Sequence, residues 1–126
     1  MSESVLLVDD DEDTGDLMCD ALRLRGFDVE SVNSAACCLS RLEQASFAVV
    51  VTDVQMPGMS GLELCSALQV THPGIRVLVM SGLKSLATVA SARARGASSF
   101  LAKPVSVAVL ADQLRQLLTA RSVDAC

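Results

Sequence analysis

The chain has 126 residues, the length of one domain, and a folded chain of this size buries enough surface to need no disulfide or metal support. Apolar residues make up 51% of it and charged residues 20%, a balance that excludes a disordered chain. The net charge of −5 and the absence of Trp and Tyr argue against a surface that binds nucleic acid or an anionic membrane.

Short apolar runs alternate with helical patterns five times along the chain, and each run predicts a strand. The predicted strands are, in chain order, Val5–Val8, Asp28–Val32, Ala48–Thr52, Arg76–Met80 and Ser99–Ala102. The third of these has the composition of a strand that is buried on both faces. Strict alternation of strands and helices predicts a parallel sheet with helices on both of its sides.

Each predicted strand is followed by a helix with one apolar stripe. The stripes consist of Leu17, Met18, Ala21 and Leu22; of Ala35, Cys38, Leu39 and Leu42; of Leu64, Cys65 and Leu68; of Leu86, Val89, Ala90 and Ala94; and of Val107, Leu110, Leu114, Leu117 and Leu118. Gly26 and Gly96 are predicted to end the first and fourth helices, and Ser34 to cap the second. Residues 120–126 are interpreted as a tail or as the start of a linker.

The cysteines do not form a metal site in this sequence. Five irregularly spaced cysteines and the single His72 match no standard zinc spacing, so we expect buried free thiols in a reducing cytosol, with Cys126 exposed. No signal peptide opens the chain, and no apolar run has the ~20 residues that cross a bilayer. These features predict a soluble cytoplasmic protein.

Polar side chains stand at the carboxyl ends of four of the five predicted strands. Asp9 and Asp10 follow the first strand, Asp53 the third, Ser81 the fourth and Lys103 the fifth. In a parallel sheet these ends meet at one edge, where ligands bind. Three converging carboxylates repel one another and require a cation, and oxygen ligands without His or Cys suit Mg²⁺ or Mn²⁺.

The single carboxylate on the central strand, Asp53, can attack phosphorus and become an acyl phosphate. No nucleotide-binding motif of the GxGxxG or GxxxxGK[ST] type is present, so another molecule must bring the phosphoryl group. A serine hydrolase is disfavoured, because GxSxG is absent and His72 lies at a predicted helix end.

The segments VLLVDDDED, VVVTDVQMPGMSGLEL, VLVMSG and GASSFLAKP resemble the receiver domain of bacterial two-component response regulators. The resemblance covers residues 4–119, and its motifs come in the family's order. It implies a flavodoxin-like (βα)₅ fold, a three-layer α/β/α sandwich with a five-stranded parallel sheet in the order 2-1-3-4-5. Residues 1–119 would then form the receiver domain.

The resemblance also implies a role for each polar residue at the sheet edge. The implied roles are phospho-acceptor for Asp53; direct Mg²⁺ ligand for Asp10; Mg²⁺ ligand through water for Asp9; ligand through its backbone carbonyl for Gln55; switch hydroxyl for Ser81; phosphoryl-binding lysine for Lys103, ahead of a cis Pro104; and switch aromatic for Phe100. The chain departs from the family at Phe100, where Tyr is frequent, and at Glu12 or Asp13, where Pro is frequent.

The implied function is that of a signalling switch that depends on phosphorylation. A sensor histidine kinase or a phosphotransfer protein would supply the phosphoryl group, and the domain would catalyse only its own phosphorylation and dephosphorylation, so it is not classed as an enzyme. The output surface would be the face of the fourth helix, fifth strand and fifth helix, through which a homodimer can form. Direct contact with nucleic acid or a membrane is not expected. The chain is either a stand-alone receiver or the amino-terminal regulatory domain of a longer transcriptional regulator.

Two other functions remain open from the residues alone. A hydrolase of the haloacid-dehalogenase type also uses an Asp nucleophile and Mg²⁺, but it needs a second acid two residues later, where this chain has Gln55. A receiver that only binds partners, without phosphorylation, is the other alternative. Within the acidic run, Asp11, Glu12 and Asp13 are interpreted as a solvated helix start, and Phe100 is almost as well explained as a core residue.

Overall fold

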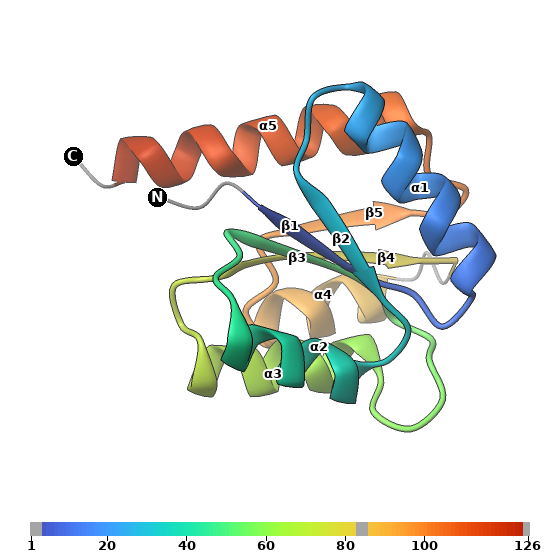
Figure 1. The fold of residues 1–126 in the computed structure, drawn as a ribbon. Coiled ribbons are helices and arrows are strands. Elements are labelled where there is room, and N and C mark those ends of the chain that lie inside the picture. Colours follow the sequence, from blue (N-terminus) through green and yellow to red (C-terminus); the bar gives the residue numbers. More distant parts are fainter. Residues whose placement is uncertain (1–3, 83–85, 125–126) are drawn as a thin grey trace.

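In the computed structural model, which describes residues 4–82 and 86–124, five parallel strands form one sheet in the order β2-β1-β3-β4-β5. The strands are β1 (Val5–Val8), β2 (Val29–Val32), β3 (Val49–Asp53), β4 (Arg76–Ser81) and β5 (Ser99–Ala102). Strand β3 lies at the centre of the sheet (Figure 1). This arrangement confirms the predicted fold class and strand order.

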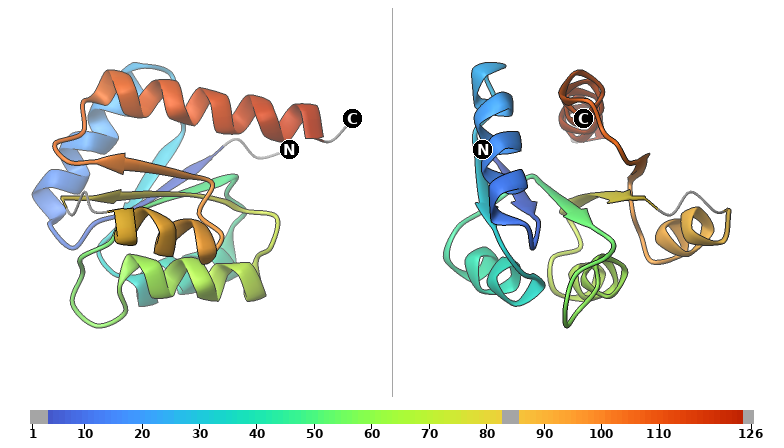
Figure 2. Two further views of the ribbon diagram at one scale, coloured as in Figure 1. Left: turned by 180° about the vertical axis from the view of Figure 1, so that it is seen from behind. Right: turned by 90° about the vertical axis from the view of Figure 1, so that its right-hand side faces the viewer.

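The helices form a layer on each side of the sheet, as the two views in Figure 2 show. They are α1 (Glu12–Leu24), α2 (Ala35–Gln44), α3 (Gly61–Thr71), α4 (Leu86–Ala94) and α5 (Val107–Asp124). Helices α1 and α5 cover one face, and α2, α3 and α4 cover the other.

The strands form because alternate side chains fill two separate cores. In β1, Val5 and Leu7 pack with α1 and α5, whereas Leu6 and Val8 pack with α2 and α3. Every residue of β1 and β3 is buried, which explains why these strands have no polar face in the sequence.

Polar residues fix the beginnings of three helices. The side chain of Asp11 accepts a hydrogen bond from Thr14 N at the start of α1. Ser34 caps α2 as predicted, and Ser60 forms a reciprocal capping box with Glu63 at the start of α3. Beyond α1 and α4, Gly26 and Gly96 take positive φ angles of 92° and 97°, which confirms where these helices end.

Two helix faces differ from the prediction. Leu17 is 71% exposed, because α1 turns Gly15, Cys19 and Leu22 to the sheet, and residue 17 lies about 200° around the helix from residue 19. In α4, two of the residues predicted to face inward, Ala90 and Ala94, are exposed, whereas Val89 is half-buried and Ala92 is buried. The alanine-rich sequence of α4 offers no contrast in size or polarity that could reveal its inner face. The side chain of Leu86 lies outside the described part of the structure.

The cysteines follow the prediction except at one position. Cys19, Cys38 and Cys65 are free and buried, and burial raises the pKa of the Cys38 thiol to about 12. Cys37 is exposed, because it lies on the outer side of α2 next to the buried Cys38. Cys126 lies outside the described residues.

The last helix is longer than predicted, because α5 continues to Asp124 through residues that were interpreted as a tail or the start of a linker. The division of the chain at residue 119 therefore has no counterpart in a change of secondary structure, and it stays a prediction. No helix in the described part of the chain has the length and apolar character that crossing a membrane requires.

Candidate functional site

The strand ends bring the predicted site residues to one edge of the sheet. Asp53 ends β3 opposite Met80 of β4, and Ser81 ends β4 one position further along, opposite Ala102 of β5. The backbone N–H of Lys103 donates to the carbonyl of Ser81 over 2.8 Å. Strands β3, β4 and β5 therefore deliver Asp53, Ser81 and Lys103 side by side, as expected for a parallel sheet.

Three carboxylates form a compact group at this edge. Asp9 and Asp10 follow β1, the neighbour of β3, and one carboxylate oxygen from each of Asp9, Asp10 and Asp53 lies within 4.8 Å of the others. Asp9 and Asp53 are only 5% and 6% exposed, whereas Asp10 is open to solvent. Oxygen ligands with one open side suit Mg²⁺, which keeps part of its water shell, so these residues fit the predicted ion.

Burial raises the pKa of Asp9 above its usual range, because the carboxylate loses contact with water. A hydrogen bond from Asp11 N to Asp9 Oδ1 at 2.9 Å and the charge of Lys103 lower this pKa, and the charges of Asp53 and Asp10 raise it. Both burial and the neighbouring carboxylates therefore disfavour the charged form of Asp9. A bound cation would offset both effects.

Lys103 forms an ion pair with Asp53 through Nζ and Oδ2. The other carboxylate oxygen, Oδ1, lies 3.4 Å from the backbone N of Gln55. The Lys103 side chain is partly exposed and Asp53 is buried, so the ammonium reaches Asp53 from the solvent side. The carboxylate thus has a fixed cationic neighbour.

The remaining predicted residues surround this centre. Ser81 is completely buried, and Gln55 is exposed in the loop after β3. The Lys103–Pro104 peptide bond is cis, as the resemblance implied. Phe100 is half-buried and packs against the core beneath α2 and α3, a position that fits either a switch aromatic or a core residue. The individual roles of these residues stay predictions.

The main chain of Asp53 has two neighbours that the sequence analysis did not identify. The Thr52 hydroxyl donates to the carbonyl oxygen of Asp53 over 3.0 Å. A Cβ atom built on Gly61 would lie 2.0 Å from the same oxygen. Two features of the sequence could have pointed to these neighbours: a hydroxyl residue at the end of an otherwise apolar strand, and a glycine at the start of a helix.

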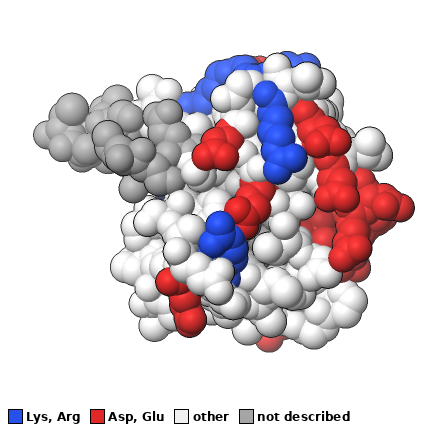
Figure 3. All heavy atoms as spheres, in the orientation of Figure 1, with Lys and Arg blue, Asp and Glu red and all other residues white. Residues whose placement is uncertain are grey.

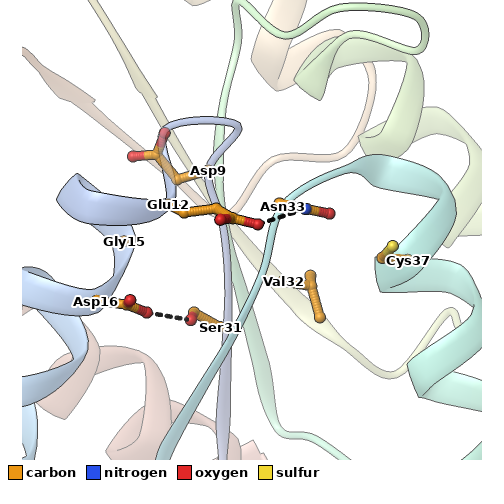
Figure 4. Close-up of a pocket in the computed structure, with 8 residues that line it drawn as sticks. All are labelled: Asp9, Glu12, Gly15, Asp16, Ser31, Val32, Asn33 and Cys37. Carbon is orange, nitrogen blue, oxygen red and sulfur yellow. Dashed lines mark hydrogen bonds between the residues drawn. The ribbon is translucent and has the colours of Figure 1, made fainter.

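On the face of the molecule drawn in Figure 3, acidic side chains gather on the right, over the region of α1. A cavity of about 420 Å³ adjoins the carboxylate group between α1, β2 and the start of α2 (Figure 4). Asp9, Glu12 and Asp16 line one side of it, and Asn33 Nδ2 donates to Glu12 Oε1 over 2.8 Å. The cavity therefore extends the negative surface away from Lys103.

A five-stranded parallel sheet in this order between two layers of helices, with an acidic group and a lysine at the carboxyl ends of its strands, is the arrangement of CheY-like receiver domains. The chain belongs to the response regulator receiver domain family, whose model matches residues 5–115. The "CheY-like" receiver domain protein from Methanospirillum hungatei JF-1 superposes with a TM-score of 0.92 at 26% identity, covering 98% of this chain and 99% of that one.

Curated relatives include both long and short proteins. The chain is 34% identical over 112 residues to the response regulator protein FleR of Pseudomonas aeruginosa. The aligned region covers 89% of this chain and 24% of FleR. It is 27% identical over 116 residues to the response regulator receiver protein CpdR of Brucella abortus, covering 92% of this chain and 97% of CpdR. The chain thus spans about a quarter of FleR and nearly all of CpdR.

Proposed function

We propose that Asp53 accepts a phosphoryl group from a phosphohistidine of a sensor histidine kinase or a phosphotransfer protein. The observation that carries this proposal is the ion pair between Lys103 and Asp53 beside the three-carboxylate group. A carboxylate at the exit of the central strand, with a cation site on one side and an ammonium on the other, has the parts that phosphoryl transfer needs.

In the proposed step, a carboxylate oxygen of Asp53 forms a bond to phosphorus opposite the P–N bond. The P–N bond breaks, its electron pair stays on the ring nitrogen, and the ring, having taken up one proton, leaves as neutral imidazole. The product is an acyl phosphate on Asp53. Its hydrolysis by water restores the carboxylate and releases inorganic phosphate, so the domain would catalyse only its own phosphorylation and dephosphorylation.

The metal site in this proposal consists of Asp10 and Asp53 as direct ligands, Asp9 through water and Gln55 through its backbone carbonyl. Mg²⁺, or Mn²⁺ in its place, would neutralise charge on the phosphoryl oxygens when bound. The side chains on the other flank act on the same oxygens. The Lys103 ammonium would leave its contact with Asp53 Oδ2 for a phosphoryl oxygen, and the Ser81 hydroxyl would donate to another.

The proposed output starts from Ser81, which ends the strand that leads to α4. Movement of Ser81 toward the phosphoryl group would shift the segment after β4, and Phe100 would turn inward. These movements would change the α4–β5–α5 face, which partners or a second copy would bind. Two states that differ by a few kcal/mol suffice for such a change. The domain would work in the cytoplasm, alone or as the regulatory part of a longer transcriptional regulator.

Phosphorylation by a small donor tests this function without knowledge of the kinase. The protein is incubated with acetyl phosphate and Mg²⁺, and the mass of the intact protein is followed over time. We expect one added phosphoryl group in the wild type and none in Asp53→Asn, with Asp28→Asn as a control of equal charge change at an exposed position outside the carboxylate group. A wild type that stays unmodified would favour the receiver that only binds partners.

A further inference from the structure

We propose that Thr52 and Gly61 are positioning residues for Asp53, and that they act on its main-chain carbonyl rather than on its carboxylate. The inference rests on the proposed role of Asp53 as the phospho-acceptor. In a phosphoryl transfer, a carboxylate must stand in line with the bond that breaks, and its aim depends on the backbone that carries it. Both contacts described below fix that backbone.

Thr52 is a buried hydroxyl residue at a position where the apolar valine would have the same shape. The residue is fully buried, and by the alternation of β3 it faces the same core as Val50 and Val54, beneath α2 and α3. A buried hydroxyl costs free energy unless it has a hydrogen-bond partner. Its partner here is the carbonyl of Asp53 at 3.0 Å. Valine has the same shape and needs no hydrogen-bond partner, so packing alone does not explain the hydroxyl.

Gly61 lets the start of α3 approach this carbonyl more closely than any side chain would allow. A Cβ at position 61 would lie 2.0 Å from the carbonyl oxygen of Asp53, 2.8 Å from its carbonyl carbon and 3.0 Å from the Cα of Val54. All three atoms belong to the backbone, which cannot move aside cheaply. The absence of a side chain at Gly61 is therefore a requirement of this contact.

The same approach closes the loop that carries Gln55. The backbone N of Gly61 donates to the carbonyl of Val54 over 2.9 Å, and Val54 N donates to the carbonyl of Met80 in β4 over 2.9 Å. The Ser60 capping box holds the adjacent start of α3. The chain around Asp53 is thus held by Thr52 from its own strand, by β4 and by α3, and Gln55 lies inside the loop that these contacts close.

The test separates the hydroxyl of Thr52 from its bulk. Thr52→Val removes the hydroxyl and keeps the shape, whereas Thr52→Ser keeps the hydroxyl. The rate of Asp53 phosphorylation is measured by intact mass at saturating acetyl phosphate and Mg²⁺, with the thermal midpoint of each variant. For Thr52→Val we expect a rate about tenfold lower, less than the ~100-fold that a 1 Å misplacement can cost, and a thermal midpoint only a few degrees below that of the wild type, because one buried hydrogen bond is lost. Thr52→Ser should restore the rate to within about twofold of the wild type.

Gly61→Ala provides the second arm, with Gly74→Ala as its control, since a Cβ at Gly74 meets no atom within 4 Å. We expect slow phosphorylation in folded Gly61→Ala and a rate like that of the wild type in Gly74→Ala. If Gly61→Ala does not fold, the Thr52 variants decide. Equal rates in Thr52→Val and the wild type, or a Thr52→Ser protein as slow as Thr52→Val, would overturn the positioning role alone. A wild type without an Asp53 adduct would overturn the proposed function as well.

Discussion

Lys103 Nζ and Asp53 Oδ2 form an ion pair although the two residues stand 50 positions apart in the sequence. The sheet produces this contact, because β3 and β5 lie on either side of β4 and end at the same edge. The bond from Lys103 N to the Ser81 carbonyl fixes the lysine's backbone at this edge. The acceptor carboxylate and its cation are therefore in place in the unphosphorylated domain.

Lys103→Ala should separate phosphorylation from signalling. The lysine stabilises the phosphorylated geometry rather than making the attack, so we expect the variant still to form an adduct with acetyl phosphate. Beryllofluoride, which mimics the phosphoryl group, should no longer shift the amide signals of residues 88–94 in α4. Nuclear magnetic resonance spectra with and without beryllofluoride measure this, with Arg25→Ala as a control at the far end of α1. Shifts of wild-type size in Lys103→Ala would show that the lysine does not couple the site to α4.

Mg²⁺ should stabilise the domain through its three carboxylates. An ion that binds only the folded protein adds RT ln(1 + [Mg²⁺]/Kd), about 1.4 kcal/mol at ten times Kd, or several degrees in melting temperature. Asp10→Asn removes one charge and the predicted direct ligand, so it should melt higher than the wild type in EDTA and respond little to ~10 mM Mg²⁺, a saturating amount for a weak carboxylate site. Asp20→Asn, on the exposed side of α1, should respond like the wild type. A wild type whose melting temperature does not respond to Mg²⁺ would show that these three carboxylates do not hold the ion.

The raised pKa of Asp9 predicts the sign of a pH effect in metal-free protein. Above the ordinary carboxyl pKa of 3.8, the unfolded chain loses the Asp9 proton before the folded protein does. The free energy of unfolding of the wild type should therefore fall, relative to that of Asp9→Asn, as the pH rises from 3.8 through the folded pKa, and the difference should then stay constant. Urea unfolding in EDTA across this range measures the difference.

Asp11 supplies the opposite control for this experiment. Hydrogen bonds from Thr14 lower the pKa of Asp11, so its contribution to stability is present above 3.8 and is lost as the pH falls through the lowered pKa. Asp11→Ala should therefore lower the free energy of unfolding at neutral pH, and this loss should shrink as the pH falls. Asp9→Asn should raise the free energy of unfolding at neutral pH, and this gain should also shrink as the pH falls. A stability difference between Asp9→Asn and the wild type that does not change with pH would contradict the burial effect at Asp9.

The observed face of α1 predicts a contrast between two leucines on the same helix. Leu22 faces the sheet from α1 and is fully buried, so Leu22→Ala should lower the free energy of unfolding by about 2–5 kcal/mol. Leu17 is mostly exposed, so Leu17→Ala should change it by about 0.5 kcal/mol or less. Chemical unfolding of both variants measures this, and similar losses at the two positions would mean that α1 is rotated relative to the described structure.

The sheet and the polar edge were predictable because their signals are local. A run such as Val49–Val51 is typical of a strand that is covered on both faces, and Asp53 is the first charged residue after it. The inner faces of α1 and α4 were less predictable. The apolar residues of α1, Leu17 and Met18 among them, are compatible with more than one inner face, and an alanine-rich helix has no distinct apolar side.

The contacts of Thr52 and Gly61 could not be predicted from the sequence for a different reason. They depend on where the loop between Asp53 and Gly61 returns to the end of β3, which is a property of the folded path and not of either residue. Threonine in a strand and glycine at a helix start are both ordinary. Their significance becomes clear only when both are found on the same carbonyl oxygen.

Locating the phosphoryl adduct tests the central claim most directly. Borohydride reduces an aspartyl phosphate to homoserine, so the protein is treated with acetyl phosphate and Mg²⁺, reduced, digested and sequenced by mass spectrometry. We predict homoserine at position 53 alone, none when EDTA replaces Mg²⁺, and none in Asp53→Asn, because Asp53 carries the single carboxylate that the central strand presents between the acidic group and Lys103. Homoserine at another aspartate of the wild type, or an adduct of equal yield in Asp53→Asn, would contradict the claim.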